Sequence, residues 1–146
     1  MIQTKLVNEY GAALSPAIEE LDALTRPILQ ELEVWAMGIP EMDGRDWAIV
    51  CTYVVAEFER YSIDKRPITS DGKWYVWLAT ARKFTFDLRR VLETWLSAHP
   101  QTYDWERVFV YQWAHGDLTC MCAQIQIKKA MAQRKAKQEI WQGGAK

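Results

Sequence analysis

Early in the chain, apolar residues recur every three or four positions, which is the spacing of one face of an α-helix. They are Ile18, Leu21, Leu24, Ile28, Leu32 and Trp35. Ser15 and Pro16 suit the start of this helix, because Ser can cap it and Pro fits the first turn. Gly38 is typical of its end. Pro27 lies inside the run, so we predict a kink or a break there, with Thr25 capping the second piece.

The most apolar stretch runs from Trp47 to Phe58, and Asp43 with Gly44 suits its start. Its core face consists of Trp47, Val50, Cys51, Val54, Val55 and Phe58, and apolar residues fill the other side as well. A helix that is apolar nearly all round is typical of the centre of a protein. The β-branched residues also suit a strand. We retain the helix because the chain offers no second strand to satisfy the backbone of a first one.

Turn and capping residues divide the rest of the chain into four more helices. A short one covers about residues 3–14. A long one runs from a cap at Ser70 or Asp71 to near His99, and its apolar stripe, residues 74–96, is expected to pack across the buried helix. A third covers about residues 102–114 and ends at Gly116, and the last runs from Asp117 to about residue 142. The sequence therefore predicts an all-α fold, a single compact array of about five to seven helices around a central buried helix, in one domain spanning residues 1–146.

Composition fits this prediction and narrows the setting of the protein. The 146 residues are 49% hydrophobic and 25% charged, which is typical of one globular domain. Three cysteines, an odd number, do not suggest a disulfide framework and suit a reducing compartment. We find neither a signal peptide nor an uncharged apolar run as long as a membrane span. We therefore expect a soluble, cytoplasmic protein without membrane association.

The net charge of −1 hides a strong asymmetry. Residues 1–64 hold 12 acidic and 4 basic residues, giving −8, whereas residues 65–146 hold 7 acidic and 14 basic residues, giving +7. Such a split indicates either an anionic partner for the basic half or two halves that complement each other, within one fold or between copies.

Three charged surfaces follow from this distribution. The main basic patch lies on the long C-terminal helix, whose end at residues 128–146 is expected to be weakly packed: Lys128, Lys129, Arg134, Lys135 and Lys137, with Trp141 as a candidate anchor. The second basic patch, on the preceding long helix, consists of Arg82, Phe86, Arg89 and Arg90. The acidic counter-surface consists of Glu19, Glu20, Asp22, Glu31 and Glu33.

Residues with metal-binding chemistry gather in one part of the sequence. His99, His115, Cys120 and Cys122 have the residue types of a zinc site. A Cys-x-Cys spacing inside a helix places the two thiols about 200° apart, so one ion cannot take both without unwinding the helix. We therefore predict no metal site and no cofactor.

Arg107 and His115 offer the one resemblance to an enzyme family. An Arg followed by a His in an all-helical chain resembles the HEPN-type ribonucleases, although the gap of seven residues is longer than in that motif. The resemblance implies RNA hydrolysis with His115 as the acid–base group. The chain has no nucleophile elbow, phosphate-binding glycine loop or His-Glu-x-x-His motif. We therefore predict that the protein is not an enzyme.

The charge split and the missing catalytic motifs favour a non-catalytic interaction or assembly protein. Its basic C-terminal helix is predicted to dock onto an acidic protein surface, on another copy of the chain or in a phage or host complex. Small helical chains rich in tryptophan, here with eight, are typical of phage and mobile-element products. One alternative is a nucleic-acid-binding accessory protein that uses the basic half. The other is a helical ribonuclease that uses His115 and Arg107.

Overall fold

The computed structural model describes residues 14–60, 73–99 and 104–144, and within these ranges the chain forms four helices and no strand. They are α2 (Leu14–Met37), α3 (Gly44–Glu59), α4 (Lys73–Ala98) and α5 (Asp104–Gly144). The predicted all-α class is confirmed. The predicted number of five to seven helices is wrong for the described ranges, and the short helix expected before residue 14 lies outside them.

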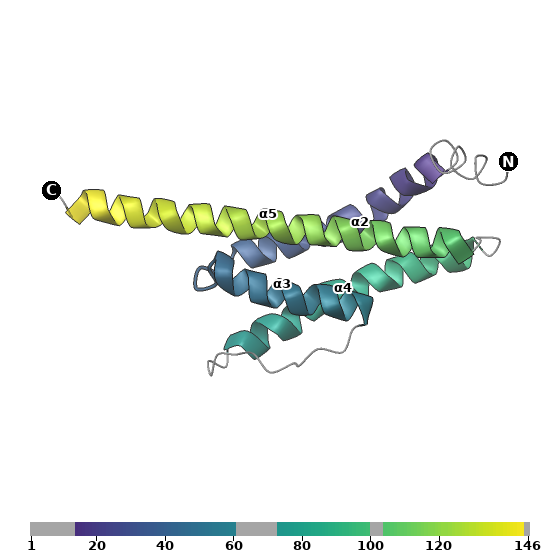
Figure 1. Ribbon diagram of the computed structural model, residues 1–146, viewed down its shortest axis with the longest axis horizontal. Coiled ribbons are helices and arrows are strands. Elements are labelled where there is room, and N and C mark those ends of the chain that lie inside the picture. Colours follow the sequence, from purple (N-terminus) through teal and green to yellow (C-terminus); the bar gives the residue numbers. More distant parts are fainter. Residues whose placement is uncertain (1–13, 61–72, 100–103, 145–146) are drawn as a thin grey trace.

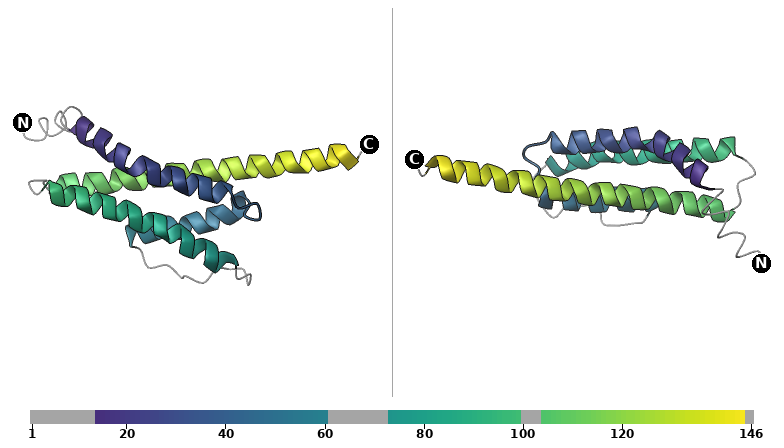
Figure 2. Two further views of the ribbon diagram at one scale, coloured as in Figure 1. Left: turned by 180° about the vertical axis from the view of Figure 1, so that it is seen from behind. Right: turned by 90° about the horizontal axis from the view of Figure 1, so that it is seen from above.

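The four helices form a bundle in which two helices run antiparallel to the other two. In Figures 1 and 2, α2 and α5 run one way along the molecule, and α3 and α4 run the other way. Helices α2 and α3 each pack against both α4 and α5. One cluster of buried side chains, with members such as Leu32, Trp47, Leu88 and Ile125, joins all four helices. None of the helices in the described ranges combines the length and the apolar content needed to cross a membrane.

Helix α3 forms for the reasons that the sequence gives. Asp43 caps it, because its Oδ1 accepts a hydrogen bond from the backbone N–H of Asp46 at 2.8 Å. The buried face includes Trp47, whose Nε1 donates to the Cys122 carbonyl oxygen of α5 at 2.9 Å. The expected enclosure on all sides is not observed, since Arg45 and Thr52 on the opposite face are exposed.

Helix α2 continues through Pro27 without the predicted break. A proline removes the hydrogen bond to the carbonyl of residue i−4, here Ala23. Both Pro27 and Ala23 lie on the exposed face, where water can take up that carbonyl. Thr25 is buried in the middle of the helix and does not cap a second piece. Packing on both sides of the proline therefore outweighs the local signal to stop.

Helix α5 likewise continues through Gly116, so the helices predicted at 102–114 and 117–142 are one helix of 41 residues. Gly116 keeps an ordinary helical backbone, since no glycine in the described ranges has a positive φ. An unbroken buried stripe crosses this position: Val110, Ala114, Leu118, Met121, Cys122 and Ile125. Its burial exceeds the cost of about 1 kcal/mol for a glycine inside a helix. Asp117 is therefore no helix cap, and α5, not α4, is the longest helix.

Helix α4 matches its prediction more closely. It packs against α3, and its buried stripe is the one expected: Leu78, Ala81, Phe84, Thr85, Leu88, Leu92 and Trp95. It ends at Ala98, one residue before the predicted His99. Its predicted caps, Ser70 and Asp71, lie outside the described residues.

Candidate functional site

The C-terminal part of α5 projects beyond the rest of the bundle (Figure 1). Every side chain from residue 131 to residue 139 is exposed. At 1.5 Å per residue, the helix from residue 131 to Gly144 extends for about 21 Å. We call residues 131–144 the projecting end of α5. Such a long exposed stretch of helix is unusual, because isolated helices shorter than about 12–15 residues are marginally stable in water.

The predicted main basic patch divides into two groups: exposed cations on the projecting end, and lysines just before it that contact the rest of the bundle. Arg134, Lys135 and Lys137 are exposed on the projecting end, as expected for an interaction surface. Lys128 instead forms an ion pair with Glu33 of α2, with Nζ 2.5 Å from Oε1. The side chain of Trp141 lies outside the described residues, so its predicted role as an anchor stays a prediction.

Lys129 is not part of an exposed patch, and its assignment there is wrong. It is only 5% exposed, and its Nζ donates to the carbonyl oxygens of Ile39 at 3.0 Å and Met42 at 2.6 Å. These carbonyls belong to the turn between α2 and α3. Burial lowers the pKa of Lys129, although nearby Asp43 and Asp46 oppose that shift. Lys129 therefore holds the α2–α3 turn against α5.

The second basic patch is also partly structural. Arg89 donates hydrogen bonds to the backbone carbonyls of Glu57 and Phe58 at the end of α3, with Nη2 2.7 Å from the Phe58 oxygen. Arg90 is exposed and pairs with Asp87 at 3.1 Å. Phe86 is exposed, whereas Arg82 has its Nε buried without a hydrogen-bond partner among the described residues. These residues do not present one continuous cationic surface.

The acidic counter-surface is largely available. Glu19, Glu20 and Glu31 are exposed on α2. Asp22 pairs with Arg26 at 2.6 Å, and Glu33 pairs with Lys128. The acidic and basic halves of the sequence therefore neutralise each other within the chain at the Lys128–Glu33 pair. The exposed acids Glu19, Glu20 and Glu31 of α2 and the cations of the projecting end of α5 do not take part in that pair.

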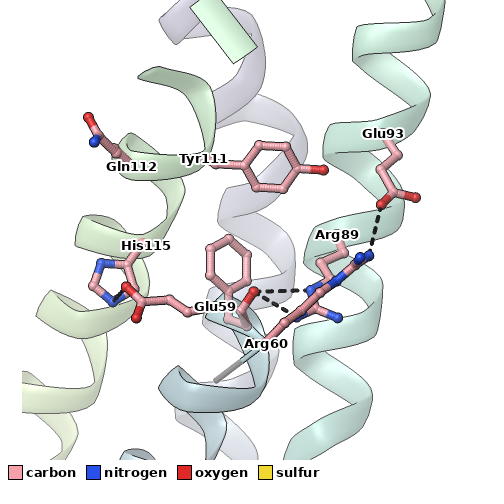
Figure 3. Close-up of a pocket in the computed structure, with 8 residues that line it drawn as sticks. Glu59, Arg60, Arg89, Glu93, Tyr111, Gln112 and His115 are labelled. Carbon is pink, nitrogen blue, oxygen red and sulfur yellow. Dashed lines mark hydrogen bonds and ion pairs between the residues drawn. The ribbon is translucent and has the colours of Figure 1, made fainter. Parts of the chain in front are cut away.

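A pocket of about 590 Å³ lies where the C-terminal end of α3 meets α4 and α5. Figure 3 shows the residues around it: Phe58, Glu59, Arg60, Arg89, Glu93, Tyr111, Gln112 and His115. His115 of α5 and Glu59 of α3 point toward one another, with Nε2 2.7 Å from Oε1. The Phe58 ring stacks on the imidazole with the ring centres 6.3 Å apart. A carboxylate beside an imidazole fixes its orientation, which suits acid–base chemistry as well as plain structural pairing.

The remaining polar groups of the pocket hold its walls. Arg60 ends α3 in the left-handed conformation, with φ of 62°, and its guanidinium lies 3.6 Å from Glu93 of α4. Burial lowers the pKa of Arg89, helped by the neighbouring Arg60, and burial raises the pKa of Tyr111. Charges of both signs alternate around the pocket, so it has no strong preference for an anion or a cation.

The structure brings together only part of the predicted ribonuclease pair. His115 borders the pocket, whereas Arg107, two turns earlier in α5, is exposed and does not line it. The partner that sequence reasoning missed is Glu59, which lies 56 positions away in the chain and meets His115 only because α3 and α5 run antiparallel. Helix spacing relates His115 to Tyr111, one turn before it, but carries no signal for Glu59.

The residues of the considered zinc cluster separate. Cys120 is exposed and Cys122 is buried, as expected for an uninterrupted helix at that point. Within residues 14–60, 73–99 and 104–144, no group of three or more His, Cys, Asp or Glu side chains is placed to hold a metal ion.

Comparisons of the chain with protein-family models, with curated proteins and with solved structures found no match in any of the three.

Proposed function

We propose that this protein is a non-catalytic interaction protein that docks the projecting end of α5 onto an acidic protein surface. The observation that carries the proposal is the exposure of every side chain from residue 131 to residue 139 on a helix that continues past its own bundle. A partner helix or groove would cover side chains that this segment leaves exposed within its own chain.

The charge of the projecting end specifies the kind of partner. The projecting end carries three cations, Arg134, Lys135 and Lys137, and a single acidic residue, Glu139. Exposed cations accelerate encounter with an acidic surface and select against basic ones. Because the Debye length at 0.15 M salt is about 8 Å, such binding weakens as salt rises.

The test compares the wild-type chain with a triple charge reversal, Arg134→Glu, Lys135→Glu and Lys137→Glu. The matched control reverses three exposed cations elsewhere in the fold, Arg45→Glu, Lys83→Glu and Arg107→Glu, so that both variants have the same net charge. Each protein is immobilised and exposed to nuclease-treated lysate of the source cells, and bound proteins are eluted with salt and identified by mass spectrometry. The wild type and the control are expected to retain a partner that the triple reversal loses.

Identical sets of bound proteins for the wild type and the triple reversal, together with an unchanged solution mass, would contradict the proposal. Recovery of nucleic acid in place of protein, when nuclease is left out, would support the nucleic-acid-binding alternative. That alternative further requires an affinity for a mixed-sequence oligonucleotide that falls steeply between 50 and 200 mM salt, roughly as phosphate contacts release counterions.

The pocket around His115 favours the ribonuclease alternative as the second candidate. Its support is the His115–Glu59 pair at 2.7 Å beside an open pocket. The exposed position of Arg107 outside the pocket weighs against it. An RNA hydrolysis assay with His115→Ala decides between the readings, because activity that survives this substitution excludes His115 as the acid–base group.

A further inference from the structure

The outer face of α2 carries acidic and apolar side chains in alternation. Glu20, Leu24, Glu31 and Val34 lie within about 80° of arc at 100° per residue, and all four are exposed. Leu24 is 45% exposed and Val34 is 74% exposed. Glu19 lies beside this face. Single exposed apolar residues are ordinary, but two of them beside carboxylates on one helix face form a surface that a basic, amphipathic helix can cover. We call this surface the acidic face of α2.

The end of α5 has the matching pattern with the opposite charge. On α5, one side of the helix carries Ile127, Met131, Arg134 and Gln138 within about 60° of arc, and Lys135 lies beside them. Ile127 is 60% exposed and Met131 is 64% exposed. Each of the two surfaces therefore offers two large apolar side chains and a pair of charges, and the charges are of opposite sign.

These two surfaces cannot cover each other along their full length within one chain. The Lys128–Glu33 pair fixes α5 beside the C-terminal part of α2, and the next residues of α5 leave the bundle there. Figures 1 and 2 place the projecting end of α5 and the N-terminal end of α2 at opposite ends of the long axis. Glu19 and Glu20 are therefore out of reach of Arg134 and Lys135 of the same copy.

We propose that the projecting end of α5 binds the acidic face of α2 on a second copy of this chain. This inference rests on the proposed function and names the partner. The two surfaces belong to different parts of the molecule, so the contact is heterologous and repeats from copy to copy, giving a ring if the rotation closes and an open chain if it does not. A contact made by a helix segment of about 21 Å is small, so association is expected at roughly micromolar concentrations.

The first measurement is the solution mass by sedimentation equilibrium, at concentrations from about 1 to several hundred micromolar, with a reducing agent present because Cys120 is exposed. The wild type is expected to exceed the monomer mass of 17.0 kDa at low salt and to return toward it at high salt.

The decisive measurement uses two variants that each remove one side of the contact. The tail variant is Arg134→Glu with Lys135→Glu, and the face variant is Glu20→Lys with Glu31→Lys. Each alone is expected to be monomeric, with an unchanged helical CD spectrum. In an equimolar mixture the intact tail of the face variant meets the intact acidic face of the tail variant, and the two reversed surfaces are again of opposite charge. The mixture is therefore expected to regain the association that each variant alone lacks. A control variant, Glu41→Lys with Asp104→Lys, reverses two other exposed acids and is expected to assemble as the wild type does.

A wild type that stays monomeric at every concentration would overturn this inference and leave the proposed function standing, with a foreign protein as the partner. Self-association that both variants retain would overturn it as well, as would a mixture that remains monomeric. The proposed function itself fails on a different result, namely a triple charge reversal of the projecting end that changes neither self-association nor the proteins captured.

Discussion

The two halves of α5 share one helix and have opposite relations to the rest of the protein. From Val110 to Ile125 the helix places an apolar residue on the bundle at every third or fourth position, and these residues are nearly inaccessible to solvent. After Lys129 no side chain in the described part of the helix is buried. The hydrophobic stripe ends, but good helix formers such as Ala, Gln, Lys and Arg continue the helix. Tertiary packing therefore stabilises the first half. The second half depends on intrinsic helix propensity and continues a helix that the first half has already nucleated.

The difference predicts that the same kind of truncation has opposite consequences in the two halves. Ile125→Ala removes a side chain that is 0% exposed and leaves a cavity between α5 and the bundle. It is expected to lower the free energy of unfolding by about 2–5 kcal/mol. Met131→Ala, six residues later, is expected to change it by less than about 0.5 kcal/mol. Urea denaturation followed by CD at 222 nm measures both, and similar losses for the two variants would show that the projecting end is packed.

Two of the helical glycines, Gly44 in α3 and Gly116 in α5, give a second contrast. A Cβ at Gly44 would lie 2.7 Å from the Gln126 carbonyl oxygen and 3.2 Å from the Ala130 amide nitrogen. Both are backbone atoms, so Gly44→Ala must separate the helices and is expected to cost about 1–3 kcal/mol. A Cβ at Gly116 meets nothing within 4 Å. Gly116→Ala is expected to stabilise the protein by about 0.5–1 kcal/mol, because Ala is the better helix former.

Thermal unfolding of the two alanine variants tests this contrast directly. An upward shift of the midpoint for Gly44→Ala would contradict the close approach of α3 to α5 at Gly44. The absence of stabilisation at Gly116 would indicate that α5 bends or opens at that position, as its sequence first suggests.

Two lysines of α5 sharpen the comparison further: one at the end of the packed half and one on the projecting end. Lys129→Met keeps the apolar stem but removes the donors to the Ile39 and Met42 carbonyls. Leaving buried carbonyls unsatisfied is expected to cost about 1–2 kcal/mol, and relief of the buried charge offsets only part of this cost. Lys135→Met on the projecting end is expected to change stability by less than about 0.5 kcal/mol. Equal effects in urea denaturation would mean that Lys129 does not hold the α2–α3 turn.

The sequence predicts well those features that depend on neighbours in the chain. The Asp43 cap, the end of α2 before Gly38 and the buried face of α3 all follow from residues within one or two turns. The break expected at Gly116 is wrong, and of the kink or break expected at Pro27 the break does not occur, because a local preference of a few kcal/mol competes there with burial along a whole helix.

The candidate sites show the same limit. A weakly packed end of the C-terminal helix at residues 128–146 is predicted from the loss of its apolar stripe, and within that range residues 131–139 are exposed whereas Lys129 is buried. The buried position of Lys129 and the Glu59–His115 pair depend on which residues of two distant helices lie opposite each other. One sequence contains the period of each helix but not the register between helices, so these contacts could not be predicted from it.

The smallest expected effect concerns a charge in the packed half of α5. Asp117 has its Oδ2 buried without a hydrogen bond, and the nearest cation, Arg26, lies 3.6 Å away. Burial raises the pKa of Asp117 above 3.8, and the attraction of Arg26 opposes this only in part. The folded state therefore binds the proton more tightly than the unfolded state does. The stability that the protonated Asp117 carboxyl contributes is lost as pH rises through the window above 3.8. At neutral pH the folded state carries the full cost of burying the ionised carboxylate.

Asp117→Asn imitates the protonated acid and removes this cost. It is expected to stabilise the protein at pH 7 by less than about 1 kcal/mol, since the side chain is partly solvated. The gain should shrink as pH falls toward 3.8, where the wild-type carboxyl also becomes neutral in both states. Glu139→Gln on the projecting end serves as the control, with an expected change below about 0.5 kcal/mol at pH 7. Urea denaturation at pH 7, 5.5 and 4 measures the trend, and a gain that grows with falling pH would show that the attraction of Arg26 exceeds the cost of burial.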